Sequence, residues 1–288
     1  MARVTSDLGR RAAVAASLEP AAESGWLRRA VDLGGRGLMH SLSLLLVAVG
    51  WEMAARAGIV TPFLLPSLSS VLERIWSDAQ SGDLVVNLGL TMYRSLFGFA
   101  ICAVLGIILG ILIARVGPIR WFFDPVISVG FPMPKIAFLP IVMLWFGLYD
   151  VSKITMVAFD AIFPVITATV AATQGVDRQM LWSARMLGAS ERQLLWEIIL
   201  PAASPQIMTG LQIGLPIAVI VEIVCEMLMG GQGLGGAMIA ASRFADSPGV
   251  FAGIVEIAVA GYLLVHGMAR LRKRLLIWHQ EAEPPTTV

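Results

Sequence analysis

The side chains best placed for chemistry in this sequence are isolated charges inside long apolar runs. Glu222 and Glu226 are four residues apart, so a helix would present both carboxylates on one face. Arg94 and Lys135 are bases in similarly apolar surroundings. Charges in such runs either form structural ion pairs or attract a charged solute. The types and spacing of these residues therefore predict either a site that attracts a charged solute or ion pairs that brace the helices.

Catalytic, metal-binding and nucleotide-binding signatures are missing from the sequence. Cys102 and Cys225 lie in apolar runs without metal spacing, the three histidines are scattered, and no Ser–His or paired-aspartate constellation lies on facing runs. The stretch GQGLGG at 231–236 matches G-x-G-x-x-G, but a dinucleotide site needs a preceding strand, and an apolar run precedes it here. We expect no catalytic, metal-binding or cofactor-binding residues, and we interpret these glycines as a tight loop.

The elements that must position these charges are membrane helices. The chain has 288 residues, of which 57% are hydrophobic and 14% charged, whereas soluble domains average about 45–50% and about 25%. Lipid leaves backbone polar groups no partner outside the segment, so an apolar run of about 20 residues predicts a spanning helix. We expect an all-α polytopic membrane protein with about six transmembrane helices, near 38–58, 86–114, 121–148, 150–173, 201–229 and 250–269.

The placement of lysine and arginine predicts the orientation. If the N-terminus is cytoplasmic, fifteen of the 21 basic residues fall on the inner side, as the positive-inside rule requires. Both termini are therefore expected in the cytoplasm. We interpret 1–36 as an N-terminal tail, 37–278 as the transmembrane domain and 279–288 as a C-terminal tail. The net charge of +1 gives no attraction for nucleic acid.

The hydrophilic loop at 174–201, between the fourth and fifth runs, is patterned as two short cytoplasmic helices. Gly188 can adopt the left-handed conformation that ends a helix. Ser190 and Gln193 then fit a capping box at the start of the next one. Pro201 suits a fresh helix start or a stop. The pattern alone allows an amphipathic helix on the bilayer surface or a docking element for a cytoplasmic partner. Its apolar face would be formed by Leu194, Leu195, Ile198 and Ile199.

The segment SARMLGASERQLLWEIILPAASPQI resembles the EAA loop of ABC-importer permeases. The pattern of that loop is E-A-A, three residues, G, nine residues and I-x-L-P. Nine residues separate Gly188 from Ile198 here, and residues 198–201, IILP, then match the I-x-L-P that closes the pattern. The leading triplet falls on Trp182, Ser183 and Ala184, so Trp182 stands where the family has its glutamate.

The resemblance covers roughly residues 45 to 278. The chain is similar to the nitrate, sulfonate, taurine and bicarbonate branch of the binding-protein-dependent permeases. The further stretches that carry the similarity occur in the family's order. They are LPSLSSVLERIW, TMYRSLFGF, PMPKIAFLPIVMLWFGLYDVSKI and VEIVCEMLMGGQGLG.

The resemblance implies the transmembrane permease subunit of an ATP-driven importer, in the inner membrane of a bacterial cell. It implies a permease homodimer in membrane lipid, two cytoplasmic ABC ATPase subunits and a periplasmic or lipid-anchored solute-binding protein. The sequence lacks G-x-x-x-x-G-K-[ST], so ATP and Mg²⁺ are expected on the partner ATPase and no cofactor on this chain. The implied ATPase-coupling residues are Ala184, Arg185, Gly188, Ala189, Ser190, Glu191, Arg192, Leu200 and Pro201.

The implied cargo is a small polar or anionic solute, such as a sulfonate, taurine, nitrate, bicarbonate or a similar organic anion. Along the translocation path Arg94 and Lys135 are the candidates to attract an anion, while Glu222 and Glu226 are suited to bracing helices. The glycines at 231–236 are expected to form an outer loop where the solute-binding protein docks. The alternative is a self-sufficient secondary transporter or channel, which would need no capped docking helix.

Overall fold

The computed structural model describes residues 42, 43, 45–58 and 60–278, and every regular element in these residues is a helix. The expected all-α class is therefore confirmed. The chain divides into two compact units, Met1–Ser69 and Ser70–Val288. The expected tails at 1–36 and 279–288 lie outside the described residues.

In the first unit, a helix over residues 45–56 is tied to the segment that follows it. The Trp51 indole N–H donates to the Pro66 carbonyl at 2.9 Å. The carboxylate of Glu52 accepts hydrogen bonds from the backbone N–H of Ser69 at 3.2 Å and from its hydroxyl at 2.9 Å. The span expected over 38–58 begins outside the described residues, so its full length stays a prediction.

The helices that follow are joined by short connections, with a 3-10 turn at Lys135–Phe138 and a π-helical turn at Leu194–Ile199. In chain order they are α2 (Leu68–Ser81), α3 (Asp83–Arg115), α4 (Gly117–Gly130), α5 (Leu139–Phe146), α6 (Asp150–Gln174), α7 (Arg178–Met186), α8 (Glu191–Gln193), α9 (Leu200–Met229), α10 (Leu234–Arg243) and α11 (Ser247–Leu275).

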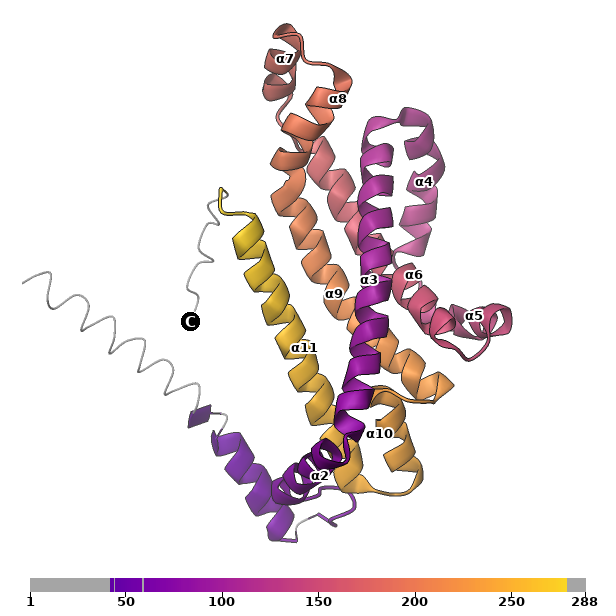
Figure 1. Ribbon diagram of the computed structural model, residues 1–288, viewed down its shortest axis with the longest axis vertical. Helices are drawn as coiled ribbons and strands as arrows, with labels where there is room; N and C mark the ends of the chain where they lie inside the picture. The colour runs from indigo at the N-terminus through magenta and orange to yellow at the C-terminus, as the bar shows by residue number, and fades with distance from the viewer. Residues whose placement is uncertain (1–41, 44, 59, 279–288) are drawn as a thin grey trace, which may run out of the picture. The chain divides into compact units, whose positions relative to one another are not determined.

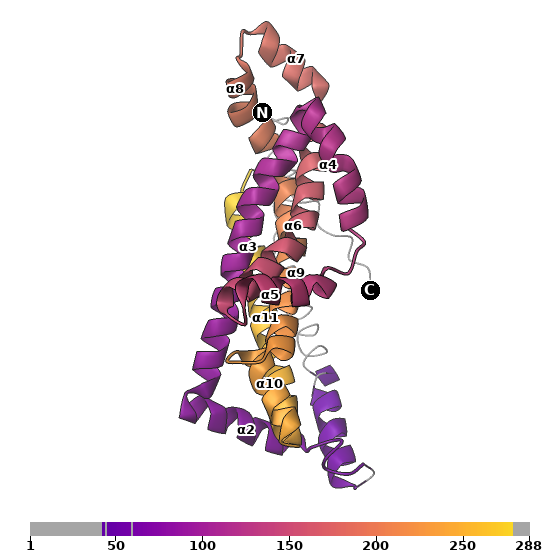
Figure 2. The ribbon, with the colours of Figure 1, turned by 90° about the vertical axis from the view of Figure 1, so that its right-hand side faces the viewer.

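Helix α6 is at the centre of the second unit, with α3 and α9 packed along it (Figures 1 and 2). Its side chains Met156, Val157 and Val165 have no exposed surface and form the middle of the apolar core. Small residues let the helices approach closely. A Cβ added at Gly110 of α3 would lie 2.6 Å from the Thr169 Cβ of α6.

Four helical segments are long and apolar enough to cross a membrane, namely α3, α6, the segment Glu191–Arg243 that contains α9, and α11. The pair Gly117–Gly130 and Lys135–Phe146 is bent by 96° and gives a fifth if it counts as one span. The run expected over 121–148 is therefore broken into two helices. Pro132 and Pro134 lie at the break, where their missing N–H groups cannot continue a helical hydrogen-bond ladder. The described residues thus contain four or five spans, and the number six stays a prediction.

The connections of the second unit gather at its two ends. Helices α7 and α8 lie at one end, next to the last turn of α3, and α10 with the loop that precedes it lies at the other (Figures 1 and 2). Helix α9 runs between the two ends, so one helix joins the hydrophilic loop to the glycine-rich one.

Candidate functional site

The turn between α7 and α8 is built around Gly188. This residue has a φ of 86°, in the left-handed region that favours glycine. Its N–H donates to the Arg185 carbonyl at 2.9 Å, and the N–H of Ala189 donates to the Ala184 carbonyl at 3.0 Å. These bonds satisfy carbonyl groups that the end of a helix leaves free. The glycine turn that the sequence predicts is therefore present at the end of α7, and backbone hydrogen bonds close it.

Helix α8 begins with the capping box that the sequence predicts. The Ser190 side chain accepts from the backbone N–H of Gln193 at 3.3 Å, and the Gln193 side chain accepts from the backbone N–H of Ser190 at 2.9 Å. Each residue therefore satisfies a donor that the first turn of a helix would leave free. The start of α8 is fixed by its own sequence.

The helical path continues from α8 into α9 without a break. Residues 194–199 form a π-helical turn, and Pro201 follows it in the first turn of α9, where it has no N–H to donate to the preceding turn. Leu194 and Ile199 are buried, whereas Glu197 is exposed. The predicted apolar face is present, and Pro201 belongs to a helix that continues through it.

Glu191 is the centre of two ion pairs in this loop. Glu191 accepts from Arg185 at 3.2 Å and from Arg115 at the end of α3. Arg192 is exposed on α8. Next to these charges, Met186 and Leu187 are each 89% exposed and form an apolar tip at the turn. The predicted coupling residues lie on α7, the Gly188 turn, α8 and the first turn of α9, and their contact with an ATPase stays a prediction.

At the other end of the second unit, a glycine loop (residues 230–236) runs from the end of α9 into the first turn of α10. Three successive N–H groups at 233–235 donate to side chains: to Asn87 Oδ1 at 2.9 Å, to Thr91 Oγ1 at 2.9 Å and to Glu226 Oε2 at 3.0 Å. Buried backbone donors require partners. Side chains of α3 and α9 supply them here, so the loop is held from inside the helix bundle.

The carbonyl groups of the glycine loop are bound in the same way. Lys153 of α6 donates to the Gly230 carbonyl at 3.1 Å, and Arg94 of α3 donates to the Gln232 carbonyl at 2.7 Å. Side chains from three helices therefore fix the loop. We call this set the polar clamp; it consists of Asn87, Thr91, Arg94, Lys153 and Glu226.

Arg94 and Glu226 form the centre of the polar clamp. The Arg94 guanidinium, 5% exposed, donates to Glu226 at 3.0 Å and to Asp150 at 2.9 Å. Glu226 has no exposed surface. A Cβ added at Gly233 would lie 2.0 Å from a Glu226 carboxylate oxygen. The carboxylate therefore lies directly against the loop backbone, and a side chain at position 233 would displace it.

The four residues predicted for the translocation path are placed in two groups. Arg94, Glu222 and Glu226 meet beneath the glycine loop, with Glu222 3.9 Å from Arg94. Lys135 lies apart from them, at the break between α4 and α5. Its ammonium is 3.1 Å from Asp160 and 4.7 Å from the centre of the Phe163 ring. Both bases are thus partnered by carboxylates in this conformation, and their exposure to a solute stays a prediction.

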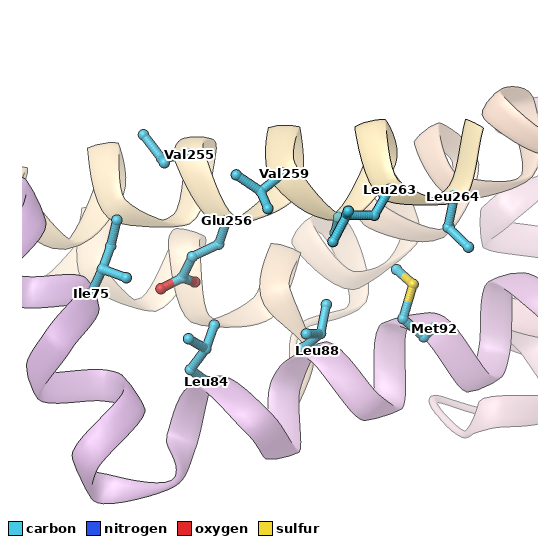
Figure 3. A pocket seen from close by; sticks show the side chains of 10 residues that line it. Ile75, Leu84, Leu88, Met92, Val255, Glu256, Val259, Leu263 and Leu264 are labelled. Atoms are coloured by element: carbon cyan, nitrogen blue, oxygen red, sulfur yellow. The ribbon is translucent and has the colours of Figure 1, made fainter. Parts of the chain in front are cut away.

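An apolar groove lies between the α2–α3 corner and α11 (Figure 3). Its volume is about 370 Å³, and Glu256 is the one charged side chain among its lining residues. The other side chains are aliphatic or methionine, such as Leu84, Leu88 and Val259. A site for a polar solute needs several convergent polar groups. The groove therefore suits hydrocarbon, such as a lipid chain or an apolar helix.

The sequence did not single out most members of the polar clamp. Asn87 and Thr91 are four residues apart and Arg94 follows three later, so all three share one face of α3. That spacing is a detectable signal. Asp150 and Lys153 gave no such signal, because in the sequence they belong to a short polar turn between two apolar runs.

The helical membrane fold, with a capped loop at one end and a clamped glycine loop at the other, defines the class of multi-pass transport permeases. The chain belongs to the family described as "Binding-protein-dependent transport system inner membrane component", which matches residues 106–277. It is 32% identical over 238 residues to the taurine transport system permease protein of Escherichia coli (strain K12), covering 81% of this chain and 86% of that protein.

Two further similarities agree with this family. A Bacillus subtilis (strain 168) protein named as an aliphatic sulfonates transport permease is 33% identical over 248 residues, which cover 86% of this chain and 90% of that protein. The fold resembles a chain in the crystal structure of an amino acid ABC transporter with histidines, with a TM-score of 0.55 at 17% identity over 70% of this chain and 96% of that chain. The protein is therefore a membrane permease subunit of an ABC importer, in a family of transporters and not of enzymes.

Proposed function

We propose that two copies of this chain form the path of an importer driven by two cytoplasmic ATPase subunits. A solute-binding protein, periplasmic or lipid-anchored, delivers the solute to the glycine-loop end. ATP and Mg²⁺ bind the ATPase subunits, and this chain holds no cofactor. Membrane lipid surrounds the homodimer.

The observation that carries this proposal is the construction of the loop formed by α7 and α8. The Gly188 turn and the Ser190 capping box fix the two short helices relative to each other. The helical path then continues through Pro201 into α9, which ends at the glycine loop. A displacement of the loop would be transmitted along a single helix to the opposite end of the bundle.

The exposed face of the loop is suited to a cleft on an ATPase subunit. Met186 and Leu187 at the turn are each 89% exposed, and Trp182 on α7 is 60% exposed. Several exposed apolar side chains on one element are typical of a docking surface. Trp182 stands where the family pattern has a glutamate, so we propose that an apolar contact replaces a charged one there.

The arrangement of basic residues supports the proposed orientation. Arg115 lies at the end of α3 and pairs with Glu191 of the loop. The basic last turn of α11, with Arg272 to Arg274, points to the same end of the second unit as α7 (Figure 1). The positive-inside rule assigns this end to the cytoplasm. The C-terminus is then cytoplasmic, and by the same rule so is the N-terminus.

The proposed solute is small and polar or anionic, such as a sulfonate, taurine, nitrate or bicarbonate. The names of the taurine and sulfonate permeases described above support this class. Arg94 and Lys135 are held by carboxylates in this conformation. We therefore propose that selection rests mainly with the solute-binding protein, and that these bases meet the solute only after the helices move.

The test is a Gly188→Asp variant in proteoliposomes that contain the permease, its ATPase subunits and its solute-binding protein. A Cβ at this φ of 86° costs about 1–2 kcal/mol, and the added carboxylate changes the docking face. We expect normal membrane insertion, loss of ATPase co-purification and loss of solute-stimulated ATP hydrolysis. Normal uptake by this variant would contradict the coupling role.

Gly82→Asp is the matched control. Gly82 also has a φ of 86° and open space around its Cβ position, but it lies at the start of α3, at the other end of the unit. It should retain the ATPase subunits. Uptake by the permease alone, without an ATPase, would instead establish a secondary transporter or channel.

A further inference from the structure

Two buried carboxyl groups lie one helical turn apart on α9, and only one of them is bound by donors. Glu226 accepts hydrogen bonds from Thr91, Arg94 and the N–H of Gly235. Glu222 has no exposed surface, and neither of its oxygens receives a hydrogen bond from an N–H, hydroxyl or ammonium donor of the described residues. The nearest cationic atom, on Arg94, is 3.9 Å away.

The charges around Glu222 do not balance. The charged groups of its cluster are Arg94 from α3, Lys153 from α6 and Glu226 from α9 itself, and Asp150 of α6 joins them through its ion pair with Arg94. If every carboxyl group were ionised, the cluster would hold three negative charges, on Glu222, Glu226 and Asp150, and two positive ones, on Arg94 and Lys153. Asp150 is half exposed and bound to Arg94, so the surplus charge falls on the fully buried Glu222. A buried carboxylate without hydrogen bonds is costly, and such a group takes up a proton instead.

Glu226 offers an acceptor for that proton. The two carboxyl groups are one helical turn apart on the same face of α9, and both approach the same Nη1 atom of Arg94, Glu222 at 3.9 Å and Glu226 at 3.0 Å. A protonated carboxyl group donates one hydrogen bond, so an O–H on Glu222 can bind the Glu226 carboxylate. Two carboxyl groups that share one proton form a known arrangement for like charges in close contact.

We propose that Glu222 and Glu226 form a buried proton-binding site, in which Glu222 carries one proton taken from water and donates it to the Glu226 carboxylate. With this proton bound, the charge of Arg94 is shared only by Glu226 and Asp150, and the polar clamp holds the glycine loop. Release of the proton would place a third anion, Glu222, 3.9 Å from Arg94. Glu222 would then compete with Glu226 for the guanidinium, and the clamp would loosen.

The experiment compares Glu222→Gln with Glu226→Gln in the purified full-length permease and needs no transport. Glutamine has the shape of a protonated glutamic acid and carries no charge. We expect Glu222→Gln to leave the unfolding temperature unchanged or raise it. Glu226→Gln removes the anion at the centre of the clamp, so its unfolding temperature should fall by about 5 °C or more.

Infrared spectroscopy provides the second measurement. The wild-type protein should show the C=O stretch of a buried protonated carboxyl group, and Glu222→Gln should lack it. A Glu222→Gln variant that fails to fold, or loses as much stability as Glu226→Gln, would overturn the proposal. So would a wild-type spectrum without the band, or a band that persists in Glu222→Gln. None of these outcomes bears on the coupling loop, so this inference and the proposed function fail separately.

Discussion

Replacing Thr91 with valine tests the polar clamp with little change in side-chain shape. The Thr91 hydroxyl donates to both carboxylate oxygens of Glu226 at 2.9 Å and accepts from the N–H of Leu234 at 2.9 Å. Thr91 has no exposed surface. The substitution removes one donor from a buried carboxylate and leaves one buried N–H without its partner.

The expected loss follows from these two contacts. A hydrogen bond to a charged group contributes about 1.5–3 kcal/mol, and an unsatisfied buried N–H costs about 1–3 kcal/mol. Because neighbouring contacts are not fully additive, we expect Thr91→Val to reduce the free energy of unfolding by about 2–5 kcal/mol. For domains of this size that corresponds to a fall of about 5–15 °C in unfolding temperature.

The assay is thermal unfolding of the detergent-solubilised permease, together with amide hydrogen exchange of the glycine loop. Thr155→Val on α6 is the control, because within the described part of the chain the Thr155 hydroxyl donates only to the Val151 carbonyl of its own helix, at 2.7 Å. That carbonyl keeps its helical partner, so the control should change little. Equal unfolding temperatures and equal exchange at residues 233–235 in the two variants would refute the argument that the clamp fixes the loop.

Two further pairs of substitutions test the packing and the broken helix by the same unfolding measurement. Gly110→Ala should lower the free energy of unfolding by about 1–3 kcal/mol, since its Cβ would lie 2.6 Å from that of Thr169. On the same helix Gly89 has no atom within 4 Å of its Cβ position, and Gly89→Ala should be neutral or stabilise by up to about 1 kcal/mol; a larger loss at Gly89 would contradict the contact. Lys135→Met leaves the Asp160 carboxylate without its ammonium partner and should cost about 1–3 kcal/mol. The added change Asp160→Asn should recover part of that loss, and no recovery would contradict the pair.

Much of the membrane architecture was predictable because lipid imposes simple rules on a sequence. The apolar runs over 86–114, 150–173, 201–229 and 250–269 coincide closely with α3, α6, α9 and α11. The run over 121–148 was not resolved into its two helices. Prolines mark where a helix can break, but the 96° bend depends on packing against other helices.

The loop at 174–201 was predictable in detail because its stabilising contacts are local. The capping box joins residues three positions apart, and the turn at Gly188 depends on its own φ and on carbonyl groups a few residues earlier. Local hydrogen bonds leave a pattern in consecutive residues. The π-helical turn at 194–199 left no such pattern, and the internal pairing of Glu191 with Arg115 joins residues far apart in the chain.

The sequence by itself determined a helical membrane protein, the capped loop and the resemblance that pointed to its family, since each depends on composition, period or short spacing. Only the tertiary structure decided how the buried charges are partnered. It joined Arg94 to Asp150 and Glu226, left Glu222 without a donor, and placed the glycine loop over the polar clamp. The physical reason is that an ion pair depends on distance in space, and side chains from α3, α6 and α9 meet only when these helices pack.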